Sequence, residues 1–188
     1  MRLFQSRVAL LSVGLPIALA ISACNQTPAV VEAPAAPAAT PVAAPTQSAV
    51  ERGKMLVFGG GCHDCHTTKK LTPAGPEPDM EHMLAGHPEN ISITAPFKPA
   101  AGSPWTIATN DTLTAWSGPW GVSFAANLTP DRDTGMGMGE RNFVIALKTG
   151  SHLGTARPIL PPMPWQQYRE LSEDDLKALY AYLKSITP

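Results

Sequence analysis

The clearest hydrophobic pattern in the chain lies near its C-terminus and predicts an amphipathic helix. One apolar stripe at spacings of three and four residues is formed by Leu176, Leu179, Tyr180 and Leu183. Ser172 stands where the N-cap is expected, and Asp175, three residues later, suits a capping box. Leu171 and Leu176 occupy the two positions of a hydrophobic staple. The tyrosines of this segment are therefore expected to pack rather than to react.

Two further segments have helical periodicity. In residues 48–58 the apolar positions recur at i, i+3 and i+7, and Gly53 is one of them. Because a glycine inside a helix costs ~1 kcal/mol relative to alanine, Gly53 indicates that another helix approaches closely at that point. Residues 59–61 are all glycine and would end this helix. Residues 140–147 predict another helix, with Gly150 as its C-terminal stop.

Residues 71–123 follow a different pattern and are rich in proline, glycine and threonine. Apolar and polar positions alternate over residues 105–109 and again over residues 112–116, on either side of an Asn-Asp pair that suits a turn. This pattern predicts a short β-hairpin. The segment would serve either as a docking surface or shield, in which its tryptophans take part, or as a packed decoration of the helical part.

The N-terminus predicts export rather than structure. A short basic region is followed by an apolar stretch that is too short for a transmembrane helix, so residues 1–23 are expected to be a signal peptide. The stretch ends in a small-residue motif before Cys24 that resembles the lipobox of bacterial lipoproteins. Lipid on Cys24 would anchor the chain to a membrane. Residues 24–47, rich in alanine and proline, would form an extended tether, which leaves residues 48–188 as the folded domain.

The charge of the chain excludes one class of partner. Its formal net charge is −1, and no run of lysine and arginine forms a basic patch. A nucleic acid is therefore not expected as a partner.

The strongest chemical signal is the pentapeptide Cys62-His63-Asp64-Cys65-His66, which has the form C-x-x-C-H. Two thiols at this spacing can form thioethers with one haem while the adjacent His66 binds the iron, so the motif predicts one covalently attached haem c. A zinc site would need further ligands, a thioredoxin-like site would need a βαβ context, and a plain disulfide between Cys62 and Cys65 is the simplest alternative. His63 is expected to face solvent.

A low-spin haem needs a second axial ligand, and Met163 is the leading candidate. It lies in a loop between prolines just before the last helix, and such a stiff loop can present a thioether at a fixed position. Met136 and Met138, in a glycine-rich loop, are the next candidates. A second histidine is also possible, and the candidates for bis-histidine ligation are His82, His87 and His152.

Several of these segments together resemble the cytochrome c family, class I. The similar stretches are residues 53–66, 127–131, 143–150 and 162–183, and they are most similar to cytochrome subunits of bacterial dehydrogenases. The resemblance implies an all-α cytochrome c fold in which residues 71–123 are an insertion, with His66 as the proximal ligand and Met163 as the distal ligand. Those subunits often carry several C-x-x-C-H motifs, whereas this chain has one.

The sequence therefore predicts an electron carrier rather than an enzyme, with a redox protein as donor and another as acceptor. Arg157 is a candidate for contact with a haem propionate, because its guanidinium fork matches a carboxylate. The predicted location is the periplasmic face of a bacterial membrane, and Asn25 after Cys24 favours the outer membrane. The alternatives are a haem enzyme or gas sensor with a labile sixth ligand, or an assembly module in which haem is structural.

Overall fold

The computed structural model describes residues 47–188 of the chain. The predicted signal peptide, Cys24 and all but the last residue of the predicted tether lie outside the described residues. None of the helices within residues 47–188 is long and apolar enough to span a membrane.

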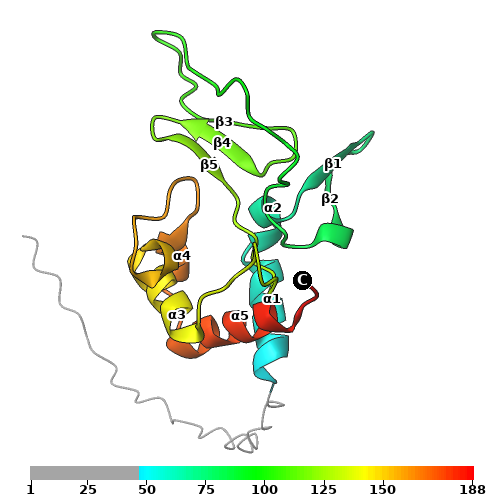
Figure 1. Ribbon diagram of the computed structural model, residues 1–188, viewed down its shortest axis with the longest axis vertical. Helices are drawn as coiled ribbons and strands as arrows, with labels where there is room; N and C mark the ends of the chain where they lie inside the picture. Colours follow the sequence, from blue (N-terminus) through cyan, green and yellow to red (C-terminus); the bar gives the residue numbers. More distant parts are fainter. Residues whose placement is uncertain (1–46) are drawn as a thin grey trace, which may run out of the picture. The chain divides into compact units, whose positions relative to one another are not determined.

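The described part combines helices with two small sheets (Figure 1). The helices are α1 (Ala49–Gly59), α2 (Cys62–His66), α3 (Glu140–Thr149), α4 (Trp165–Tyr168) and α5 (Glu173–Ser185). The strands are β1 (Lys69–Thr72), β2 (Gly75–Pro78), β3 (Ala108–Thr109), β4 (Ala115–Gly118) and β5 (Gly121–Phe124). Two 3-10 turns complete the order, η1 (Met80–His82) and η2 (His152–Gly154).

The predicted hairpin is present, but it is shorter than expected and pairs with a further strand. Strands β3 and β4 pair antiparallel with Thr109 opposite Trp116, and Trp105 is 72% exposed and lies outside both strands. A third strand, β5, pairs with β4, and a separate hairpin joins β1 to β2. Because the described residues mix helix and sheet, the all-α cytochrome c fold stays a prediction for the helical part.

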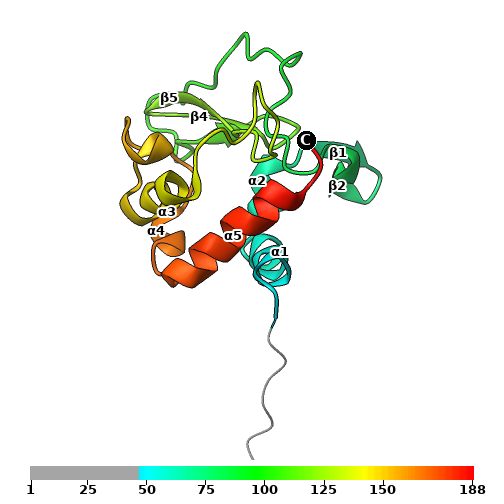
Figure 2. The same cartoon turned by 60° about the horizontal axis from the view of Figure 1, so that its bottom comes forward.

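The helical core is organised by the crossing of α1 and α5; in Figure 2, α5 runs lengthwise and α1 is seen nearly along its axis beside it. Gly53 lies at the crossing, where a Cβ atom would overlap the carbonyl oxygen of Ala178. The close approach predicted from Gly53 is thus confirmed. Beside it, Arg52 Nε donates to a carboxylate oxygen of Asp175 at 2.7 Å and ties the two helices together.

The helix ends explain why these segments fold locally. Ser48 caps α1 with a reciprocal capping box to Glu51, and Gly150 ends α3 at φ 72°. Ser172 Oγ accepts the backbone N–H of Asp175 at 3.0 Å, as predicted. The second half of the expected capping box is absent from α5, because the Asp175 carboxylate turns to Arg52 instead.

The hydrophobic core draws on both the helices and the segment between α2 and α3. Its buried members are Val57, Leu84, Met136, Phe143, Leu147, Leu176, Leu179, Tyr182 and Leu183. Leu84 has no solvent exposure although it belongs to the segment predicted to be an insertion. This segment is therefore part of the core and not only a surface addition.

The α1–α5 crossing generates a direct test of the core. Gly53→Ala should lower the free energy of unfolding by about 1–3 kcal/mol or more, because the new methyl group cannot fit against the α5 backbone. Gly59→Ala, in the same helix with no atom within 4 Å of the added Cβ, is the matched control and should not destabilise. Denaturant unfolding of the full chain measures both. Equal stability of the two variants would contradict this crossing.

Candidate haem site

The site begins at the glycine run between α1 and α2. Gly61 is the N-cap of α2 at φ 73°, in the left-handed region that side chains rarely adopt. The chain turns sharply there and places Cys62, Cys65 and His66 on a single helical turn. The three residues of the predicted motif are thus brought together by local structure alone.

Both cysteines of the motif carry free thiols and are partly buried. Burial raises the pKa of Cys62 to about 11 and also raises the pKa of Cys65. Both sulfurs are therefore protonated thiols at neutral pH, and no disulfide joins them. Within residues 47–188 there is also no group of three or more His, Cys, Asp or Glu side chains arranged to hold a metal ion.

The imidazole of His66 is fixed by the backbone around it. Its Nδ1–H donates to the carbonyl oxygen of Ala126 at 2.7 Å, and the backbone N–H of Gly86 donates to the His66 carbonyl oxygen at 2.8 Å. Burial lowers the pKa of His66, so the ring is neutral at pH 7. Since Nδ1 carries the proton, Nε2 keeps its lone pair, which is the arrangement of a metal-binding histidine oriented by a carbonyl.

Two adjoining cavities open beside the motif, with volumes of about 380 Å³ and about 260 Å³. Both are lined by Cys65, His66 and Met163, so the structure brings these predicted residues together. Cys62 lines the larger cavity, whose walls are mainly apolar and include Leu128, Phe143, Leu147, Leu179 and Leu183. An imidazole, a thioether and two thiols around an apolar space are the donor set of a c-type haem with His/Met ligation, so the residues fit that group.

The three histidines that could replace Met163 as a ligand differ in their hydrogen bonds and in whether they line the cavities. His87 already uses both ring nitrogens, at 2.8 Å from Thr114 Oγ1 and at 2.8 Å from the Ile91 carbonyl oxygen. His82 pairs with Asp79 at 2.8 Å with its side chain 68% exposed, and it lines neither cavity. His152 lines both cavities and is the histidine that could compete with Met163.

The alternative methionines lie on the wall of the larger cavity. Met136 and Met138 both line it, but neither lines the smaller one. Met136 is only 4% exposed and packs in the core.

The prediction that His63 faces solvent is wrong. The residue is only 8% exposed, and its ring packs against Phe58 of α1 in a tilted arrangement, with 4.4 Å between ring centroids and 46° between the ring planes. Nδ1 lies 2.9 Å from Thr67 Oγ1, while Nε2 is buried without a partner in the described residues. The reason is that α2 begins only three residues after α1 ends, so the first turn of α2 directs the His63 side chain towards the C-terminal end of α1.

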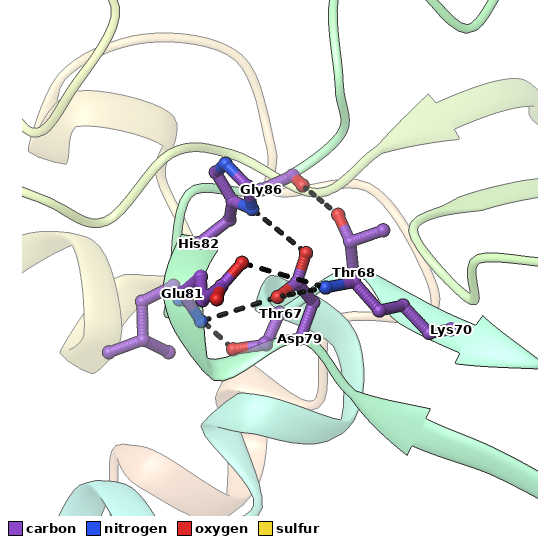
Figure 3. A network of polar contacts seen from close by, with 8 residues as sticks. Thr67, Thr68, Lys70, Asp79, Glu81, His82 and Gly86 are labelled. Atoms are coloured by element: carbon purple, nitrogen blue, oxygen red, sulfur yellow. Dashed lines mark hydrogen bonds and ion pairs between the residues drawn. The ribbon is translucent and has the colours of Figure 1, made fainter.

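A polar network that the sequence did not indicate supports the strand leaving the motif (Figure 3). The Asp79 carboxylate, in a residue 7% exposed, lies 2.9 Å from Lys70 Nζ and 2.8 Å from His82 Nδ1. Next to it, Thr68 Oγ1 donates to the Gly86 carbonyl oxygen at 3.3 Å. This network fixes the turn that carries Gly86 to the backbone of His66. The sequence does not reveal its long-range part, because Lys70 lies in β1 whereas Asp79 is the N-cap of η1, and the pair forms only when the hairpin folds.

Arg157 lies at the smaller cavity, which Met163 and His66 also line. Its side chain is exposed, and its Nη1 donates to the neighbouring Pro158 carbonyl oxygen at 3.0 Å. Cys24, the predicted lipidation site, lies outside the described residues.

The chain is similar to subunits of dehydrogenases. It is 30% identical over 136 residues to the gluconate 2-dehydrogenase cytochrome c subunit of Pantoea cypripedii, a match that covers 71% of this chain and 22% of that protein. It is 26% identical over 145 residues to the fructose dehydrogenase cytochrome subunit of Gluconobacter japonicus, covering 77% of this chain and 22% of that protein. It is also 35% identical over 65 residues to the cytochrome c subunit of the quinone-dependent alcohol dehydrogenase of Gluconobacter oxydans, covering 34% of this chain and 13% of that protein.

These relatives support a relationship to the cytochrome c family at low identity, and the chain spans less than a quarter of the length of each. No family model matches the chain.

The Asp79 network predicts an acid-sensitive contribution to stability. Hydrogen bonds from His82 and Lys70 lower the pKa of Asp79 in the folded protein. Its stabilisation is therefore present above the unfolded pKa of ~3.9 and is lost as the pH falls through the folded pKa. Asp79→Asn should destabilise the chain at pH 6, and the difference from the wild type should shrink towards pH 3.

Unfolding measured across this pH range tests the network. The charge-matched control is Asp133→Asn, at an exposed carboxylate without an ion pair in the described residues. Its effect should be smaller at pH 6. An Asp79→Asn penalty that stays constant down to pH 3 would refute the role assigned to this carboxylate.

Proposed function

We propose that this chain is an electron carrier that holds one haem c, attached at Cys62 and Cys65, with His66 and Met163 as axial ligands. The observation that carries the proposal is the shared cavity lining of His66 and Met163 beside both thiols. The similarity to cytochrome subunits of dehydrogenases supports the same class of function.

The residues of the chain have distinct roles in this proposal. When bound, the haem supplies a one-electron couple, and the protein sets its potential. The Ala126 carbonyl, by accepting the Nδ1–H of His66, increases the basicity of the ring nitrogen that would bind iron. A thioether opposite histidine raises the potential, and the apolar walls keep water away. Two protein ligands leave no substrate position, so we propose a carrier and not an enzyme.

We also propose that the helical part has the cytochrome c arrangement. Three features support it: the close α1–α5 crossing at Gly53, the haem motif directly after α1, and Met163 in the loop that leads into α4 and then α5. In this proposal the β1–β5 region is an insertion that has become part of the core through Leu84.

Arg157 is proposed as a contact for a haem propionate. It lines the smaller cavity together with His66 and Met163, and its guanidinium uses one donor on a neighbouring carbonyl. The remaining donors of the fork suit a carboxylate.

The partners are proposed to be redox proteins, with a dehydrogenase or its cytochrome as the class of donor. This follows from the names of the relatives, of which the chain spans only a part. The single C-x-x-C-H motif means that this chain would contribute one haem and not a relay of several. Attachment through lipid at Cys24 would hold it at the periplasmic face of a bacterial membrane, with the outer membrane favoured over the inner, and nucleic acid is not proposed as a partner.

One observation favours a second function, that of a haem enzyme or gas sensor with a labile sixth ligand. His152 lines both cavities beside Met163, so an imidazole capable of acid–base chemistry lies at the same space. In such a protein Met163 would leave the iron readily.

Substitution of Met163 distinguishes the two functions and tests the ligand. In the haem-loaded protein, Met163→Leu should abolish the sulfur–iron charge-transfer absorption band and allow the reduced form to bind carbon monoxide rapidly. The volume of the side chain is nearly conserved, so the fold should persist. Absorption spectra of the oxidised and reduced protein, with and without carbon monoxide, measure both effects.

The matched control is Met138→Leu, the same change on the wall of the larger cavity. It should leave the band in place. Loss of the band in Met138→Leu but not in Met163→Leu would reassign the ligand. Rapid carbon monoxide binding by the wild-type protein would favour the enzyme or sensor.

A further inference from the structure

A chain of hydrogen bonds joins the three-stranded sheet to the loop that carries Met163. Ser123 Oγ, in β5, donates to the carbonyl oxygen of Pro161 at 2.6 Å. Trp120 Nε1 donates to the same Ser123 oxygen at 3.2 Å. Because a serine hydroxyl has one hydrogen and an indole nitrogen can only donate, the chain has a single direction, from Trp120 through Ser123 to Pro161.

The sheet forms a wall of the smaller cavity at this point. Ser123 is 8% exposed and pairs in register with Trp116 of β4. The cavity is lined by Trp116, which is the cross-strand partner of Ser123, and by Phe124, which follows Ser123 in β5. Met163 also lines it. The hydrogen bond therefore runs from the cavity wall to the loop two residues before the proposed ligand.

The loop that carries Met163 makes few other hydrogen bonds that could fix its position. Prolines at 161, 162 and 164 have no N–H group to donate. Within residues 47–188, the bond from Ser123 is the only hydrogen bond made by the segment from Leu160 to Pro162. On either side, Ile159 N–H donates to Gly150 and the Met163 carbonyl accepts from Trp165.

We propose that Ser123 is a positioning residue for the Met163 thioether, so that the β3–β4–β5 sheet controls the strength of the sixth ligand. This inference rests on the proposed function, because it needs Met163 to bind a haem iron. Without the Ser123 bond the loop loses its anchor on the side of the cavity, and the ligand-dissociated form becomes more populated.

A pair of serine substitutions in the same sheet tests the proposal. Ser117 of β4 is also 8% exposed, and its Oγ donates to the Phe97 carbonyl oxygen at 2.9 Å, so it makes the same kind of bond to a different loop. Ser123→Ala and Ser117→Ala remove equivalent groups at equal burial. Only Ser123→Ala should weaken the sulfur–iron charge-transfer band of the haem-loaded protein.

The expected size of the effect follows from the strength of one hydrogen bond. A contribution of ~1 kcal/mol corresponds to a roughly fivefold larger population of the dissociated form, and to a similar increase in the rate of carbon monoxide binding to the reduced protein. Ser123→Thr, which keeps a hydroxyl, should restore both readings towards wild type.

The outcomes separate this inference from the proposed function. If the absorption spectrum of Met163→Leu is the same as that of the wild-type protein, the proposed function is overturned. Suppose that the band depends on Met163 but is equally strong in Ser123→Ala and Ser117→Ala. This result would overturn the inference and leave the proposed function standing. If Ser123→Ala yields no haem-loaded protein, Ser123→Cys takes its place, because a thiol is only a weak donor to the Pro161 carbonyl oxygen. A band as strong in Ser123→Cys as in Ser117→Cys would count against the inference.

Discussion

The His66 imidazole is held by one hydrogen bond, which its Nδ1–H donates to the carbonyl oxygen of Ala126 at 2.7 Å. The bond needs the backbone of Ala126 to lie close to the motif, and Gly86 makes this possible. A Cβ at Gly86, whose φ is 78°, would overlap the carbonyl groups of Ala125 and Ala126. The same glycine donates its N–H to the His66 carbonyl, so the ring and the backbone of the proposed ligand are fixed together.

The proposed second ligand is held in a different way. Leu179 and Leu183 of α5 line the larger cavity together with other apolar core residues, and strands β4 and β5 line the smaller one. Met163 lines both cavities and lies on a loop whose prolines limit its conformations but also remove its donors. Its position therefore depends on neighbours such as Ser123, whereas His66 is fixed by its own helix and by Ala126. This difference makes the thioether the ligand whose strength the surrounding protein can adjust.

The sequence predicted the features that depend on local chemistry. The cap at Ser172 and the glycine stop at Gly150 are both present, because each is specified within a few residues. The approach at Gly53 is also present, because a glycine inside a helix marks the place where another backbone comes close. The sequence did not predict the contacts that depend on backbone groups far away along the chain. A carbonyl acceptor such as that of Ala126 has no side-chain signature, the burial of His63 depends on how α2 folds back, and the third strand β5 pairs only in the folded chain.

Covalent attachment of one haem is the central claim, and an intact mass of the purified chain tests it most directly. The chain should be exported in a host that attaches haem to C-x-x-C-H motifs, then denatured and extracted with acidified organic solvent before weighing. The mass should exceed that of the mature polypeptide by one haem, and the excess should disappear when Cys62 and Cys65 are both changed to serine. A chain that carries no haem after extraction, or that keeps one without both thiols, would contradict the proposed site.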